Sequence, residues 1–385
     1  MRARTRIATI VAASALLGVS VATSGPIGAS AAPVAPPIGG ARMASHATVV
    51  AANAPRLPQG IDARGWLVAD AGTGEVLAAH DPHGKYLPAS TLKTLTALTL
   101  LPALPDRRQV VTAVPEETNV DGTRVGLVPH GRYSVELLFE CMLMMSGNDC
   151  ATALAYTAGH GSVRKSLAAM NAKARSMQAL DTHAGTPSGL DAPGQASSAY
   201  DLAMILRADI KIPDFTRYNS KLTGYVPAQG KKYKRFGFAN DDRLRAAHYP
   251  GIIAAKNGYT DAARHEFVAA VRHGSRTLIV TLMHAERYPV DTQDQAIRLL
   301  DWGFAVDGKI KPVGTLVSAP KPRPARRPTP SATASTSKPA ADQKAATATA
   351  ESGDSGGWHL PVIIGVVVLV LLAAAGGIAY RRRSA

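Results

Sequence analysis

Two runs without a charged residue lie near the ends of this chain, and they limit how much of it can form a globular domain. The first, residues 7–21, follows three arginines and precedes the small residues 29–31. This order is typical of a secretory signal peptide, although a membrane anchor also contains such a run. Because the run is short and Gly25-Pro26 follows it, we predict a signal peptide over residues 1–31.

The second run, residues 360–380, contains 21 residues. At about 1.5 Å per residue it can cross a hydrocarbon core of about 30 Å. Trp358 and Tyr380 lie at its ends, and arginines follow at 381–383. Since positive residues stay on the cytoplasmic side, we predict a transmembrane helix and basic cytoplasmic tail over 358–385. This makes the chain a single-pass protein of the cell membrane with its main domain extracellular.

The segments next to these runs are low in large apolar residues. Residues 318–357 consist mainly of Pro, Ala, Thr, Ser and Lys, and such a stretch cannot bury enough surface to offset its ordering entropy. We predict a disordered tether there and an Ala/Pro-rich spacer over 32–57. The remainder, residues 58–317, is long enough for one domain with a sizeable core.

The distribution of charge argues against a nucleic-acid partner. The chain has 43 Lys+Arg and 28 Asp+Glu, a formal charge of +15. Nine of these net charges lie in residues 1–31, 318–357 and 381–383, which leaves the rest only mildly basic. Two cysteines, Cys141 and Cys150, give neither a cysteine zinc-ligand spacing nor a disulfide framework. In an exported chain they form either one disulfide or two buried thiols.

The predicted elements follow the order strands, helices, strands. A hairpin over 65–79 comes first, and three strand-length apolar runs come last, at 251–256, 266–271 and 277–283. Between them, helical patterns cover residues 91–101, 135–145, 151–157, 162–180 and 198–207. This order predicts an α+β fold with an antiparallel sheet formed by both ends of the domain and flanked by helices.

Ser90 and Lys93 are a candidate nucleophile and base at the start of the first predicted helix. Residues three apart share a helix face, so the amine can reach the hydroxyl. Lysine can accept the proton only when neutral, which requires a pKa several units below about 10.4. The same Ser-x-x-Lys spacing recurs at 162–165 and 335–338, so the motif alone is weak.

Two further motifs follow in order. Ser146-Gly147-Asn148 could relay a proton and hold a peptide carbonyl, or could be a turn that caps the next helix. Lys256-Asn257-Gly258 places a cation and a glycine on a strand, where a substrate backbone can approach, or could be a turn at a strand end. Each motif alone is more often structural, whereas the ordered set is far more specific.

The ordered set resembles that of penicillin-binding proteins and serine β-lactamases. Segments 86–93, 143–149, 186–203 and 249–260 are similar to the low-molecular-mass D-alanyl-D-alanine carboxypeptidases, and the resemblance covers residues 60–290. It implies the DD-peptidase/β-lactamase-like fold with a helical subdomain. It also implies removal of the terminal D-alanine from peptidoglycan stem pentapeptides through an acyl-enzyme, acylation by β-lactams as inhibitors, and no metal or cofactor.

The resemblance also implies a role for each motif residue. Ser90 would be acylated, Lys93 would be its base, Ser146 would pass the proton to the leaving D-alanine, and Asn148 would bind the acyl-side amide. Lys256 would supply positive potential and lower the pKa of Lys93. Backbone N–H groups of Ser90 and of a residue near Tyr259, beside Gly258, would form the oxyanion hole. Arg276, on the next strand, would contact the substrate carboxylate.

One residue departs from the family pattern. Asn257 stands where the family usually has threonine. Its amide can still donate to a carboxylate, so we expect activity with an altered β-lactam or substrate preference.

Three alternatives remain open: a β-lactamase, a DD-endopeptidase of the same fold, or a catalytically silent wall-binding module. The absence of a Glu-x-x-Leu-Asn segment between the second and third motifs argues against a class A β-lactamase. The presence of reactive residues in all three motifs argues against a silent module.

Overall fold

The computed structural model describes residues 37–318. The predicted signal peptide and transmembrane helix lie outside the described residues, as does nearly all of the predicted tether. Among residues 37–318, no helix is both long enough and apolar enough to cross a membrane.

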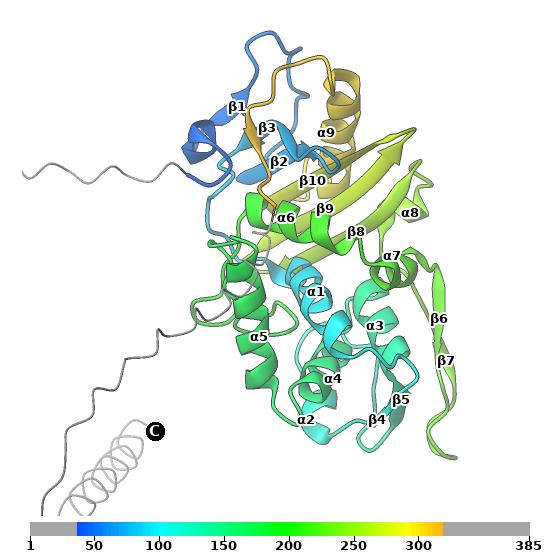
Figure 1. Cartoon of the computed structure of the whole chain (residues 1–385). Helices are drawn as coiled ribbons and strands as arrows, with labels where there is room; N and C mark the ends of the chain where they lie inside the picture. The colour runs from blue at the N-terminus through cyan, green and yellow to red at the C-terminus, as the bar shows by residue number, and fades with distance from the viewer. Residues whose placement is uncertain (1–36, 319–385) are drawn as a thin grey trace, which may run out of the picture. The chain divides into compact units, whose positions relative to one another are not determined.

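A seven-stranded sheet is built from both ends of the described chain (Figure 1). Its order is β1-β3-β2-β10-β9-β8, with β11 also on β3, and every pairing is antiparallel. The strands are β1 (Thr48–Val50), β2 (Gly65–Asp70), β3 (Glu75–His80), β8 (Ile252–Thr260), β9 (Arg264–His273), β10 (Arg276–Ala285) and β11 (Gly314–Thr315). The α+β prediction is confirmed.

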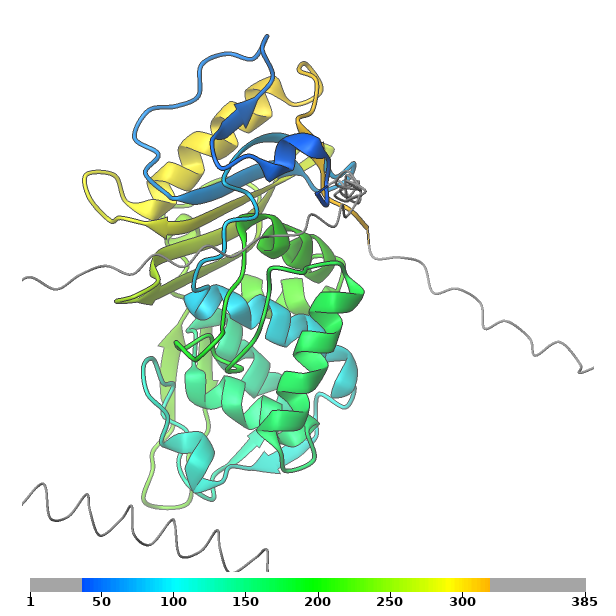
Figure 2. The ribbon, with the colours of Figure 1, turned by 90° about the vertical axis from the view of Figure 1, so that its left-hand side faces the viewer.

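Helices bury both faces of this sheet, which explains why its central strands are almost continuously apolar. Along β9, Phe267 and Ala269 join one core cluster, while Val268 and Ala270 join the other. Helix α9 (Thr292–Val306) packs on the first face and α6 (Ala199–Asp209) on the second. In the view of Figure 2, α9 and α6 lie on opposite sides of the sheet.

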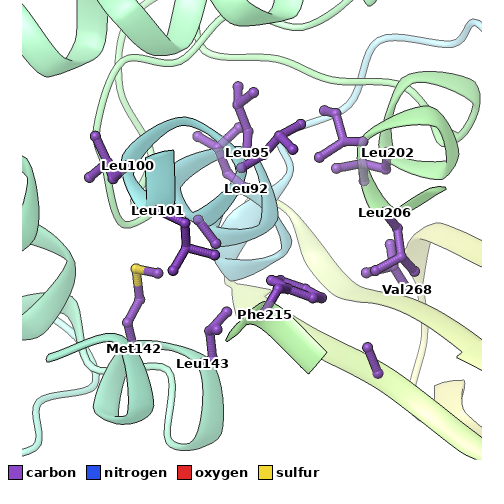
Figure 3. Close-up of a cluster of buried hydrophobic side chains, with 14 of the residues drawn as sticks. Leu92, Leu95, Leu100, Leu101, Met142, Leu143, Leu202, Leu206, Phe215 and Val268 are labelled. Carbon is purple, nitrogen blue, oxygen red and sulfur yellow. The ribbon is translucent and has the colours of Figure 1, made fainter. Parts of the chain in front are cut away.

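Helix α1 forms the centre of the helical part of the molecule. All nine residues from Lys93 to Leu101 are buried, so the helix is enclosed on every side rather than amphipathic. Leu92, Leu95 and Leu101 pack with side chains from α3, α6 and α7 (Figure 3). The helices and short strands of this part are η2 (Ala89–Leu92), α1 (Lys93–Ala103), β4 (Val110–Thr112), α2 (Pro115–Thr118), β5 (Arg132–Ser134), α3 (Val135–Met144), α4 (Asn148–Ala158), α5 (Val163–Ser176) and α7 (Pro213–Ser220).

The prediction of a spacer over 32–57 was wrong for its described part. Residues 41–44 form a short 3-10 helix, η1 (Ala41–Ala44), and Met43 is fully buried. Strand β1 then pairs with β3. Met43 and Val49 of this Ala/Pro-rich stretch are buried in the core, so the folded unit begins before residue 58.

Two other features complete the fold. A hairpin of β6 (Thr223–Val226) and β7 (Phe236–Ala239) lies beside α3, and the short helix α8 (Arg243–Ala246) follows it. Cys141 and Cys150 are buried free thiols, which decides between the two alternatives left open above.

Candidate active site

Ser90 and Lys93 meet at the junction of η2 and α1. Ala89, fully buried before the serine, has a positive φ of 43°, a conformation that costs free energy for a residue with a side chain. The Lys93 Nζ atom lies 2.8 Å from Ser90 Oγ. The sequence spacing therefore places the amine within hydrogen-bond reach of the hydroxyl.

The other contacts of Lys93 determine what its amine can do. Nζ lies 2.7 Å from Asn148 Oδ1 and 2.7 Å from the backbone carbonyl of Ser188, and both oxygens can only accept hydrogen bonds. A neutral amine has two N–H groups and one lone pair. With both N–H groups donated to these oxygens, the lone pair is left for the Ser90 hydroxyl.

Burial favours this neutral form. Lys93 is fully buried, and burial holds its pKa well below the usual lysine range. The charge of Lys256 lowers the pKa further, while the carboxylates of Asp241 and Asp149 oppose the shift. Burial and the charge of Lys256 thus provide the lowered pKa that a lysine base requires.

The second motif lies across the site, between α3 and α4. Ser146 has a positive φ of 64°, and within residues 37–318 its buried Oγ has no hydrogen-bond partner. Asn148 begins α4 and donates Nδ2 to the carbonyl of Asp121 at 2.7 Å, which fixes Oδ1 toward Lys93. The motif therefore forms a turn before α4 and also contacts Lys93, so its structural and its catalytic interpretation are compatible.

Asp149 is a residue that sequence reasoning missed. It is fully buried, and its carboxylate accepts hydrogen bonds from the backbone N–H groups of Val125, Gly126 and Leu127 at 2.9–3.1 Å. It therefore holds the 120s loop against the start of α4. An acidic residue directly after Asn148, near a helix N-terminus, was the available signal.

The third motif lies on edge strand β8, which packs against η2. A Cβ added at Gly258 would lie 2.8 Å from the Ser90 backbone nitrogen, so only glycine allows this approach. Lys256 is buried, and its Nζ donates to Asn257 Oδ1 at 3.0 Å. The amide of Asn257 lies 3.4 Å from Asp241 Oδ2. Burial lowers the pKa of Lys256, against the opposing charges of Asp241 and Asp242.

The prediction for Arg276 was wrong. It opens β10, opposite His273 of β9, and pairs with Asp307 at 2.7 Å. The β10 position in line with Lys256 is Thr281, so Arg276 lies about 17 Å farther along the strand, at the other end of the sheet. It cannot reach a substrate bound beside Lys256.

Two other arginines lie where Arg276 was expected. A pocket of about 200 Å³ beside the third motif is lined by Asn257, Tyr259, Arg243 and Arg287, among others. Asp291 pairs with Arg243 at 2.7 Å and with Arg287 at 3.6 Å. Ala285, at the end of β10, pairs with His265 of β9, which pairs with Tyr259 of β8. Arg287 follows two residues later, so the antiparallel register places it level with the third motif.

Comparisons with known proteins agree with this geometry. The D-alanyl-D-alanine carboxypeptidase family matches residues 48–287. The D-alanyl-D-alanine carboxypeptidase DacB2 of Mycobacterium tuberculosis is 39% identical over 277 residues, which cover 71% of this chain and 92% of the relative. DacD of Salmonella typhimurium, also a D-alanyl-D-alanine carboxypeptidase, is 35% identical, and the match covers 64% of each chain.

Solved structures give the same result. A crystal structure of a D-alanyl-D-alanine carboxypeptidase from Mycobacterium tuberculosis matches with a TM-score of 0.65 and 38% identity, covering 70% of this chain and all of that one. Penicillin-binding protein 6B of Escherichia coli matches with a TM-score of 0.59 and 29% identity, covering 67% of this chain and 82% of that one. The chain belongs to the D-alanyl-D-alanine carboxypeptidase family of serine peptidases.

Proposed function

We propose that this serine-type D-Ala-D-Ala carboxypeptidase uses Ser90 as its nucleophile and Lys93 as the general base. The arrangement around Lys93 supports this assignment: two obligate acceptors take its N–H groups, and the third contact is Ser90 Oγ at 2.8 Å. The neutral amine takes the Ser90 proton as Oγ attacks the carbonyl of the penultimate D-alanine. No step of this scheme calls for a metal or cofactor.

Acylation forms a bond between Ser90 Oγ and that carbonyl carbon and breaks its bond to the terminal D-alanine nitrogen. Ser146 Oγ passes the proton to this nitrogen, and Asn148 binds the acyl-side amide. The close approach of Gly258 to Ser90 brings two backbone N–H groups together, one from Ser90 and one near Tyr259, to stabilise the oxyanion. Water then attacks the acyl carbon, the ester bond to Ser90 Oγ breaks, a proton of the water returns to Oγ, and the shortened peptide leaves as its carboxylic acid.

The pocket beside the third motif would bind the terminal carboxylate of the pentapeptide. Lys256 supplies positive potential, and Asn257 donates its amide. We assign the role expected of Arg276 to Arg287, which lines this pocket together with Asn257. The same groups would bind the carboxylate of a β-lactam.

Mass spectrometry of a D-Ala-D-Ala pentapeptide digest tests this assignment. The wild type should release one D-alanine, and Ser90→Ala should release none. Penicillin should leave a long-lived adduct on the Ser90 peptide of the wild type. Rapid turnover of penicillin would indicate a β-lactamase instead, and cleavage of cross-linked dimers a DD-endopeptidase. Release of D-alanine by Ser90→Ala would contradict the assignment.

We also propose that the domain acts outside the cell, held by a single membrane-spanning segment over residues 360–380. The charge-free run and the arginines that follow it support this location. Cells making the full chain should retain penicillin-labelled protein in the membrane fraction, exposed to protease added outside. A chain truncated after residue 357 should be released, and its retention would contradict the anchor.

A further inference from the structure

Three side chains outside the active site form a compact cluster of possible metal ligands. His83, Asp181 and Asp201 offer ligand atoms that all lie within 4.8 Å of one another. They come from three segments: the connection from β3 to η2, the connection from α5 to α6, and α6 itself. The proposed mechanism uses none of them.

The hydrogen bonding of His83 defines which ring nitrogen is free. Its Nε2 lies 3.0 Å from the backbone carbonyl of Ile38, an oxygen that can only accept. Nε2 therefore carries a hydrogen, and in the neutral ring the lone pair is on Nδ1. The ring of Tyr200, 4.5 Å away between centroids, packs on the imidazole. Histidines that bind metals are commonly oriented in this way, with the second N–H donated to a carbonyl.

Nδ1 faces the carboxylate of Asp181, which in its ionised form can accept hydrogen bonds but cannot donate one. It lies 2.7 Å from Asp181 Oδ2, an oxygen that also accepts from Ser198 Oγ at 3.1 Å. A lone pair and a carboxylate oxygen repel each other at this distance unless a cation lies between them. That cation is either a proton or a metal ion.

Asp201 supplies the independent observation that separates this cluster from an ordinary histidine–aspartate pair. Its side chain is 1% exposed, and Oδ2 accepts from the Asp181 backbone N–H and from Thr182 Oγ1. Its other oxygen, Oδ1, is buried without a hydrogen-bond partner among the described residues. A buried carboxylate oxygen that receives no hydrogen bond is available as a ligand atom for a cation.

We propose that His83 Nδ1, Asp181 and Asp201 bind one divalent metal ion, for which Zn²⁺ is the best chemical match. One imidazole with two carboxylates favours zinc over magnesium or calcium, which prefer all-oxygen sites. The two carboxylates balance its charge, and the metal takes the place of the proton between Nδ1 and Asp181. The side chains of His83 and Asp181 are 22% and 16% exposed, which leaves access for the ion and a water ligand.

Binding would require a small local movement. Ligands about 2.0–2.2 Å from a tetrahedral zinc ion are more than 3 Å apart, so the contact between Nδ1 and Asp181 must lengthen. Lys85 Nζ, 3.9 Å from Asp181 Oδ1, is largely exposed and can turn away. The bound ion would join the connection that leads to Ser90 to the connection that carries Ser188, the residue whose carbonyl accepts from Lys93.

Zinc titration of the full chain, after removal of metals by a chelator, tests the proposal. Calorimetry should show one equivalent of Zn²⁺ bound. At a free zinc concentration about 100-fold above Kd, the Tm should rise by about 5–10 °C. Co²⁺ should substitute and give the visible absorption of a tetrahedral nitrogen/oxygen site. These readouts do not depend on catalytic activity.

Two variants locate the site, and a third serves as a matched control. Asp201→Asn keeps an acceptor for Asp181 and Thr182 but removes the charge, and His83→Gln removes the imidazole. Both should lose the zinc-dependent rise in Tm while keeping the far-UV circular dichroism of the wild type. His46 also forms a pair with a carboxylate, Asp81 at 2.6 Å, but it is 89% exposed, so His46→Gln should respond to zinc like the wild type.

The opposite results would overturn the proposal. If Zn²⁺ leaves the Tm of the wild type unchanged, a proton and not a metal lies between His83 and Asp181. If Asp201→Asn and His83→Gln bind zinc as tightly as the wild type, the metal is bound elsewhere.

Discussion

Asn148 Oδ1 lies 2.7 Å from Lys93 Nζ, so a single amide connects the second motif to the candidate base. The same amide donates Nδ2 to the carbonyl of Asp121, which leaves its orientation no freedom. Asn148 therefore helps keep Lys93 neutral, because an amide oxygen accepts an N–H without adding negative charge.

The first prediction concerns Asn148→Asp, which keeps the shape but adds a negative charge beside Lys93. The charge favours the ammonium form and raises the pKa of Lys93. Since the base acts only when neutral, acylation by a penicillin, measured against pH, should start at higher pH than in the wild type. At pH values below the wild-type plateau we expect the acylation rate to fall about 10-fold or more, because the whole rate profile moves to higher pH.

Asn171→Asp is the matched control for this experiment. Asn171 bonds the backbone of Ala184 and lies on α5. Its variant should keep the wild-type pH profile. An Asn148→Asp profile that superimposes on the wild type would show that the amide does not set the charge of Lys93.

The second prediction concerns Gly258→Ala. The new Cβ would lie 2.8 Å from the Ser90 nitrogen and 3.0 Å from Ala89 Cβ, so β8 and η2 must separate. A misplacement of about 1 Å at reacting groups can cost about 100-fold in rate. We expect a loss of that size in the acylation rate. Gly237→Ala, whose Cβ would have the Tyr225 side chain as its nearest neighbour at 3.3 Å, should acylate normally.

The third prediction compares two arginines. Arg287→Ala should lower kcat/KM for the pentapeptide about tenfold or more, because a cation is lost from the carboxylate pocket. Arg276→Ala should leave kcat/KM within about twofold while lowering the Tm, since it leaves the buried Asp307 unpaired. A larger kinetic loss for Arg276→Ala than for Arg287→Ala would reverse our assignment.

The fourth prediction concerns the stability of the 120s loop. Asp149→Ala removes the acceptor of the Val125, Gly126 and Leu127 N–H groups, and it should lower the free energy of unfolding by about 3 kcal/mol in urea titrations. Glu286→Gln, which breaks the exposed pair with Arg264, should cost less than about 1 kcal/mol. Equal effects would show that Asp149 does not anchor the loop.

The sequence predicted the strands best where packing leaves a strong pattern. Strands β8, β9 and β10 are buried on both faces, so each is an apolar run that stands out without an alignment. Helix α9 was missed although its signal was present. Asp291 caps it, and Ala296, Leu299 and Gly303 recur at helical spacing on its buried face. The pairing of β1 with β3 depends on contacts distant in sequence and left no local signal.

In the active site, too, some residues could be predicted from the sequence and others could not. Ser90, Lys93 and Asn148 were predicted because they belong to short motifs with fixed spacing, and the structure brings them within hydrogen-bond reach. Ser188 contributes only a backbone carbonyl, so no side-chain pattern could reveal it. Arg276 was misplaced because adjacency in sequence was taken for adjacency in space, without following the antiparallel register through β10.

Both ends of the described chain are attached to the same edge of the sheet. Strands β1 and β11 both pair with β3, and the Thr315 N–H donates to the Gly39 carbonyl at 2.9 Å. A mechanical load applied at residue 318 would therefore act first on β11 and on its contacts with α6, where Arg207 donates to the Leu316 carbonyl at 3.0 Å. Strand β8, which bears the third motif, is the opposite edge of the sheet. Tension on the polypeptide would thus enter the sheet at the edge farthest from the third motif.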